Sequence, residues 1–109
     1  MVEVCQGNAV LCGICICRIK HVDCSGLELQ SVPRNSYSSD TETLNLSNNN
    51  IIEIKEHDFD TYPAMKFLFL DHNQLRTIHN KALLSLRNLT YLDLSRNDLN
   101  IQVLEKSVF

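Results

Sequence analysis

A fixed spacing of 24 residues orders the leucines of this 109-residue chain. The pattern Leu-x-Leu-x-x-Asn-x-Leu (or Ile) occurs three times, at Leu44, Leu46, Asn49 and Ile51, at Leu68, Leu70, Asn73 and Leu75, and at Leu92, Leu94, Asn97 and Leu99. Repetition at a period of roughly 20 to 50 residues predicts a solenoid, in which each coil buries its apolar side chains against the neighbouring coils.

The spacing within each repeat predicts the shape of one coil. Two leucines at alternate positions point to the same side of a short strand, so we expect one strand per coil, stacked with the others as a parallel sheet. The repeated asparagine follows the strand, and its amide is both a donor and an acceptor. We therefore expect Asn49, Asn73 and Asn97 to form a structural ladder that bonds the backbone of their own turn and the adjacent turn.

Further apolar positions recur on the return side of each coil, and we expect them to point inward. They are Ile54, Phe59 and Tyr62 in the first coil and Ile78, Leu83 and Leu86 in the second. The pattern is typical of leucine-rich repeats, and the predicted fold class is an α/β-type leucine-rich repeat solenoid. A parallel β-sheet would form its concave face, with loops or short helical turns on the convex face.

The repeats divide residues 41–109 into units 41–64, 65–88 and an incomplete 89–109. After Leu99 the third unit departs from the pattern, which indicates a two-residue insertion if Val108-Phe109 closes the coil. We expect the chain to be a fragment of a longer protein.

Five cysteines lie at positions 5, 12, 15, 17 and 24, and none follows. In a short chain, such a cluster indicates a disulfide framework or a zinc site. Cys15 and Cys17 are too close to pair easily on an extended strand, and the spacing leaves the other two pairings of Cys12, Cys15, Cys17 and Cys24 open. A single Cys-x-x-Cys elbow argues against a four-thiolate zinc site, and its strand-like surroundings argue against a redox site. We expect a disulfide-stapled cap over residues 12–40, after a tail at 1–11.

The cysteine cluster is followed by Leu29-x-x-Val32-Pro33 and then by the leucine repeats. This arrangement resembles the N-terminal flanking cap of extracellular leucine-rich repeat proteins, such as small leucine-rich proteoglycans, Slit proteins, the Nogo receptor and Toll-like receptors. The resemblance covers residues 12–109. It implies that the polar stretch 34–42 is the loop into the first full coil, with Tyr37 turned inward, and that the protein is secreted or a cell-surface ectodomain.

The resemblance also implies a disulfide pairing. In that family the first and third cysteines pair, as do the second and fourth, which corresponds here to Cys12–Cys17 and Cys15–Cys24. The first gap is two residues here, whereas three is commoner in the family, and Cys5 is an additional cysteine that could replace Cys12.

Solenoids bind partners through the outward side chains of the concave sheet. These are predicted to be Thr43, Asn45 and Ser47 in the first coil, Phe67, Phe69 and Asp71 in the second, and Tyr91, Asp93 and Ser95 in the third. The aromatics are candidate ligand-binding anchors, and the alternative is that they pack against one another. Asp71 and Asp93 would add an acidic rim suited to a basic partner, unless they are solvated strand ends.

Other classes of function have little support in the sequence. The net charge is −3, with basic and acidic residues well mixed, so no nucleic acid partner is expected. The basic cluster Arg18, Lys20 and His21 is interpreted as a solvated loop. No apolar run is long enough to span a membrane. The histidines lack metal-ligand spacing, and no catalytic triad pattern or glycine-rich phosphate loop occurs, so we expect no enzyme, cofactor or metal site.

Two sequences match the N-glycosylation acceptor, Asn45-Leu46-Ser47 and Asn88-Leu89-Thr90. The predicted function is a protein-binding module of a cell-surface or secreted protein, which recognises a protein ligand or co-receptor through the concave sheet. One alternative is a structural extracellular-matrix protein of the small leucine-rich type, and another is a cytosolic repeat scaffold. Membrane anchoring of the full-length protein is left open.

Overall fold

The computed structural model describes residues 10–12, 14–33 and 39–100, with side chains described from residue 14 onward. Within these ranges the chain forms short strands and turns and no helix. The strands are β1 (Val10–Cys12), β2 (Cys15–Arg18), β3 (His21–Asp23), β4 (Thr43–Asn45), β5 (Glu53–Ile54), β6 (Phe67–Phe69), β7 (Thr77–Ile78) and β8 (Tyr91–Asp93).

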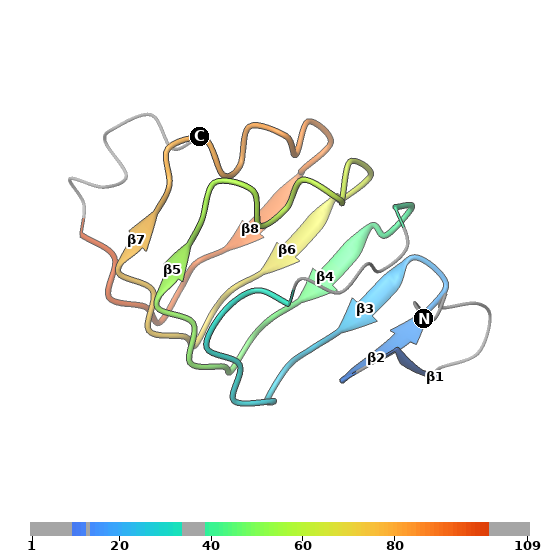
Figure 1. The fold of residues 1–109 in the computed structure, drawn as a ribbon, viewed down its shortest axis with the longest axis horizontal. Helices are drawn as coiled ribbons and strands as arrows, with labels where there is room; N and C mark the ends of the chain where they lie inside the picture. Colours follow the sequence, from blue (N-terminus) through green and yellow to red (C-terminus); the bar gives the residue numbers. More distant parts are fainter. Residues whose placement is uncertain (1–9, 13, 34–38, 101–109) are drawn as a thin grey trace.

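One six-stranded sheet runs along the molecule in the order β1-β2-β3-β4-β6-β8 (Figure 1). The pairs β1–β2 and β2–β3 are antiparallel, whereas β3, β4, β6 and β8 pair in parallel. Leu44 lies opposite Leu68, and Leu68 opposite Leu92, so equivalent positions of successive repeats are adjacent in the sheet. The chain is therefore a leucine-rich repeat solenoid that begins with an antiparallel cap.

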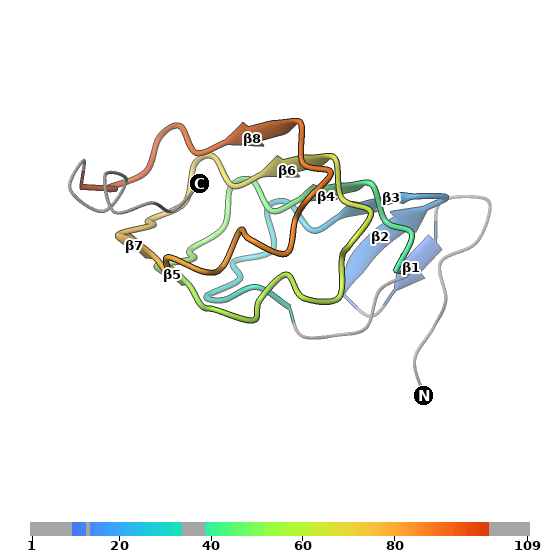
Figure 2. The same ribbon diagram turned by 90° about the horizontal axis from the view of Figure 1, so that it is seen from above.

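The return segments lie across the core from this sheet (Figure 2). They carry a second, two-stranded sheet in which Ile54 of β5 pairs with Ile78 of β7. The rest of the convex side consists of turns. The predicted loops are found, while the helical part of an α/β description is absent from the described residues.

The core lies between the two sheets and consists of the repeated apolar positions. Leu44, Leu46, Leu68, Leu70 and the return-side Phe59 and Tyr62 are all at most 1% exposed. Leu92, Leu94 and Leu99 pack against this core but are only partly buried. Their coil has a neighbouring coil on only one side within the described part of the chain.

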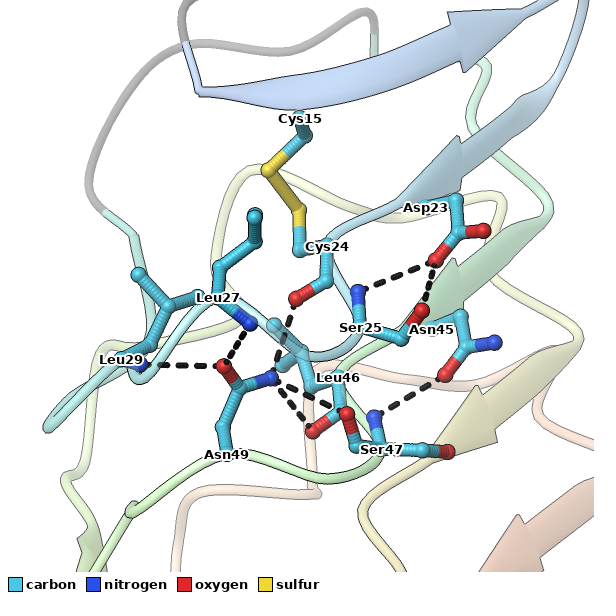
Figure 3. Close-up of a disulfide and its surroundings, with 10 residues drawn as sticks. All are labelled: Cys15, Asp23, Cys24, Ser25, Leu27, Leu29, Asn45, Leu46, Ser47 and Asn49. Atoms are coloured by element: carbon cyan, nitrogen blue, oxygen red, sulfur yellow. Dashed lines mark hydrogen bonds between the residues drawn. A yellow bond between two sulfur atoms is a disulfide. The ribbon is translucent and has the colours of Figure 1, made fainter.

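A disulfide joins two strands of the cap. Cys15 of β2 and Cys24, just after β3, are both fully buried and their sulfurs are 2.04 Å apart (Figure 3). This pairing agrees with the one that the family resemblance implied. Cys17 is also disulfide-bonded. Its predicted partner, the side chain of Cys12, lies outside the described residues, as do Cys5, Tyr37 and the predicted insertion after Leu99.

The repeated asparagines connect each coil to the coil before it. Asn73 Nδ2 donates to Leu46 O of the preceding coil at 2.9 Å and to Leu70 O of its own coil at 3.1 Å. Asn73 Oδ1 accepts from the backbone N–H of Ile51 at 3.1 Å. The buried amide of Asn73 therefore satisfies backbone groups of two coils.

The same arrangement repeats at both neighbouring coils. Asn49 Oδ1 accepts from the N–H groups of Leu27 and Leu29, and its Nδ2 donates to Cys24 O at 2.9 Å (Figure 3). Asn97 bonds Leu70 O and Leu75 N in the equivalent way. The first member of the series thus connects the repeats to the disulfide-bonded cap.

We expect Asn73→Leu to destabilise the fold strongly. Leucine has a similar size but no hydrogen-bonding groups, so buried backbone groups of two coils lose their partners, at a cost of about 1–3 kcal/mol each. The check is the free energy of unfolding from urea denaturation. Asn50→Leu, at an exposed asparagine of the preceding turn, is the control and should change stability little. Equal midpoints for the two variants would contradict the role of Asn73.

Candidate functional site

The outward face of the large sheet carries the predicted binding residues. Strand register places them in rows that run across the strands. One row is Arg18, His21, Thr43, Phe67 and Tyr91, and the next is Ile16, Asp23, Asn45, Phe69 and Asp93. Because alternate residues of a strand point to opposite faces, these side chains lie opposite the buried leucines.

The three predicted aromatics form one patch over β6 and β8, here called the aromatic patch (Phe67, Phe69 and Tyr91). The rings of Phe69 and Tyr91 contact each other, with centroids 5.3 Å apart and planes tilted by 44°. Phe67 and Tyr91 nevertheless remain 39% and 48% exposed. Packing within the patch therefore covers only part of its apolar surface.

The polar residues of the second row are used to hold the turns that follow the strands. Asp23 Oδ1 accepts from the backbone N–H of Ser25 at 3.0 Å and from its hydroxyl at 2.6 Å. Asp93 accepts the same two bonds from Ser95. Asn45 Oδ1 accepts from the N–H of Ser47 at 2.9 Å. An Asp or Asn followed two residues later by Ser is thus the local device that ends β3, β4 and β8.

Strand β6 is the exception, because Phe69 occupies the position of the turn-holding residue. Asp71, two residues later, takes a different role and accepts from the Ser47 hydroxyl of the neighbouring coil at 2.6 Å. Nδ1 of His72 lies 2.8 Å from the other Asp71 oxygen. Ser47 was predicted to be available to a partner, and this is wrong: it is only 8% exposed because it packs beside Asp71.

These contacts change the expected role of the acidic residues. The Asp71 side chain is only 15% exposed and makes hydrogen bonds within the protein. Burial acts to raise the pKa of Asp71, but the hydrogen bonds from Ser47 and His72 outweigh it, and the pKa lies below its ordinary value of 3.8. Asp71 is therefore used first in a bond between coils and Asp93 in its turn, and less of each carboxylate is left for a partner.

A second feature of this face was not predicted. A hollow of about 300 Å³ lies over β2, β3 and β4, here called the cap hollow, and the outward side chains that line it are Ile16, Arg18, His21, Asp23, Thr43 and Asn45. The basic cluster was interpreted as a loop, but Arg18 lies in β2 and His21 in β3. The alternation of buried Cys15 and Cys17 with exposed Ile16 and Arg18 is the sequence signal that could have placed them on the sheet.

The other cations near this face are paired. Glu42 lies between two lysines, with its oxygens 3.6 Å from Lys20 Nζ and 3.7 Å from Lys66 Nζ. Such partly exposed pairs contribute little to stability, but they balance the charge at the start of the strands.

The two predicted glycosylation sites differ in position. Asn45 lies in the middle of the sheet and is partly buried, whereas Asn88 is exposed, and its Nδ2 donates to Pro63 O at 3.2 Å.

Among the described side chains, no group of three or more His, Cys, Asp or Glu residues could hold a metal ion. No helix of the described chain is long and apolar enough to cross a membrane.

The family model "Leucine rich repeat" matches this chain twice, over residues 21–75 and 39–99. The chain belongs to the leucine-rich repeat family. It is 41% identical over 62 residues to leucine-rich repeat-containing G-protein coupled receptor 4 of Bos taurus. It is 49% identical over 45 residues to biglycan of Xenopus laevis, and 38% identical over 61 residues to biglycan of Sus scrofa.

These matches cover 41% to 57% of this chain, and they span only 6% to 22% of the length of the relatives. One relative is named as a receptor and two are named as biglycan. The comparisons therefore support a protein-interaction module built from leucine-rich repeats.

We expect Asp71→Asn to change how stability depends on pH. A carboxylate whose pKa is lowered by folding contributes stability that is present above the unfolded-state pKa of about 4 and is lost as the pH falls through the lowered folded value. The wild type should therefore lose more stability than the variant between about pH 5 and pH 2. Unfolding free energies measured across this range provide the check, with the exposed Asp98→Asn as control. Parallel acid limbs for wild type and Asp71→Asn would contradict the assignment.

Proposed function

We propose that this chain is the recognition module of an extracellular leucine-rich repeat protein and binds a protein ligand through the outward face of β4, β6 and β8. The observation that carries the proposal is the aromatic patch. Exposed aromatic side chains on a rigid sheet supply large contact area at a low entropic cost, and such residues are enriched among the energetic centres of interfaces.

The identity of residue 69 strengthens this argument. The equivalent residues Asp23, Asn45 and Asp93 each hold the following turn, whereas Phe69 cannot accept such a bond. Phe69 is half-buried against Tyr91 and lies on the face opposite the core, so it adds nothing to the packing of the leucines. An aromatic residue that gives up a turn bond and leaves the patch exposed is better explained by binding than by folding.

The extracellular setting of the proposal is supported by the cap. Disulfides persist in secreted and cell-surface proteins and are rare in the cytosol, and Cys15, Cys17 and Cys24 are all disulfide-bonded. This disfavours the cytosolic scaffold. The structural-matrix role remains a second candidate because two of the relatives are biglycans. The division into tail, cap and three repeats belongs to the same proposal, as does the Cys12–Cys17 bridge.

Glycosylation is a further part of this proposal. The exposed side chain of Asn88 leaves room for a glycan outside the sheet face. A glycan on Asn45 would stand beside the aromatic patch and compete with a protein ligand for the same surface, because Asn45 pairs in register with Phe69. We therefore favour Asn88 as the acceptor.

The aromatic patch can be tested with the double variant Phe67→Ser/Tyr91→Ser. Its binding to a panel of secreted proteins and receptor ectodomains is measured against the wild type by biolayer interferometry. We expect affinities to fall by about tenfold or more, because two exposed anchors are removed. The control is Ile52→Ser/Leu84→Ser, which removes two apolar side chains that are 49% and 58% exposed but lie outside the large sheet. Binding that survives the first variant and is lost in the control would place the interface elsewhere.

The extracellular assignment makes a separate prediction about thiols. Intact mass after alkylation without reductant should show that Cys15, Cys17 and Cys24 are protected, and reduction should then make them reactive. Five alkylated thiols in the unreduced protein would rule out the extracellular assignment.

A further inference from the structure

The cap hollow adjoins the aromatic patch on the same face of the sheet. Thr43 and Asn45, which line the hollow, lie beside Phe67 and Phe69 in strand register. Its volume of about 300 Å³ is at the small end of the range for sites that enclose a whole ligand. The hollow is therefore better suited to one or two side chains of a larger partner than to a free small molecule.

The charged side chains that line the hollow differ in how much of their hydrogen-bonding capacity is available to a partner. Arg18 and His21 are cross-strand partners, both are exposed, and within the described residues neither makes an ion pair or a side-chain hydrogen bond. Asp23 instead accepts two bonds from Ser25. Both of these bonds are accepted by Asp23 Oδ1. Arg18 thus presents an available guanidinium beside the imidazole of His21, and a guanidinium matches a carboxylate with two parallel bonds.

The apolar part of the hollow lies next to this guanidinium. Ile16 is 47% exposed and lies one row from Arg18, and it belongs to the same lining. A partner side chain with an apolar stem and a carboxylate at its end would cover Ile16 with its stem and pair with the guanidinium of Arg18.

We propose that the cap hollow binds an acidic side chain of the protein ligand, with its carboxylate on Arg18 beside His21 and its stem on Ile16. This rests on the proposed function, because the same ligand segment places an apolar residue on the aromatic patch. Arg18 lies in β2, and three strand spacings of about 4.8 Å separate β2 from β6, which an extended segment spans in about four residues. The ligand motif is therefore an Asp or Glu about four residues from a large apolar residue.

A single carboxylate fits this surface better than a sulfated polysaccharide. A polyanion would require a run of available cations, yet Lys20 and Lys66 are paired with Glu42. Asp23 and Asp93 lie along the next row of the face, and the chain carries a net charge of −3. Repulsion from these negative charges would weaken the binding of a densely charged polyanion more than it would weaken the binding of a single acidic side chain.

The test is selection from a bead-displayed library of random 12-residue peptides against four forms of the whole chain. These are the wild type, Arg18→Gln, Phe67→Ser/Tyr91→Ser, and Arg76→Gln as a control at an exposed arginine beside β7. The wild type and the control should enrich Asp or Glu about four residues from a large apolar residue. Arg18→Gln should lose the acidic preference and keep the apolar one.

An enriched peptide and its Glu→Gln or Asp→Asn derivative then measure the coupling. The derivative should bind the wild type about tenfold more weakly and should bind Arg18→Gln as well as the parent peptide does. Heparin is assayed in parallel against all four forms.

The outcomes separate the two proposals. Apolar enrichment that depends on Phe67 and Tyr91, without any acidic preference, overturns the role of the hollow and leaves the proposed function standing. Enrichment that ignores every substitution overturns both, and so does a selection that enriches no peptide. Heparin binding that Arg18→Gln abolishes, with no acidic peptide enriched, assigns the hollow to a sulfated glycan and overturns the proposal.

Discussion

The asparagine amide at the end of each strand is the interaction on which the rest of this structure depends. A solenoid coil must turn sharply after a short strand, and the turn leaves backbone groups that neither sheet can satisfy. Asn49, Asn73 and Asn97 satisfy them from inside the molecule and do so across two coils at once. Stacking is therefore specified by hydrogen bonds as well as by the burial of leucine, and the same bonds attach the first coil to the disulfide-bonded cap.

Because this ladder and the inward leucines stabilise the coils, the outward residues are free to differ from one coil to the next. The second coil uses this freedom most. Phe69 replaces the residue that holds the turn elsewhere, and Asp71 with Ser47 supplies a bond between coils. Phe67 on the same strand and Tyr91 on the next, which pair in register with each other, complete an exposed patch. The proposed binding surface thus lies where the repeat departs from its own local pattern.

The predictable part of the fold followed from periodicity. The alternation of leucines predicted the strands, the inward residues and the pairing of equivalent positions, because successive side chains of a strand point to opposite faces of the sheet. The pairing of Cys15 with Cys24 came from resemblance, since spacing alone left two arrangements open. The burial of Ser47 and the hollow beside Arg18 could not be predicted in the same way. Both depend on side chains from different coils or hairpins that meet only after the strands have paired.

The sequence by itself determined the architecture: a 24-residue repeat can bury its leucines only by stacking one strand per coil, and cysteines confined to the first quarter place the staple at that end. The tertiary structure decided which outward groups remain available. It committed Asp71 to a bond between coils and Asp93 to a turn, paired Lys20 and Lys66 with Glu42, and left Arg18, Phe67 and Tyr91 exposed. The physical reason is that burial of a repeated apolar position is a local property of the pattern, whereas the freedom of a polar group depends on neighbours that the fold brings from other coils.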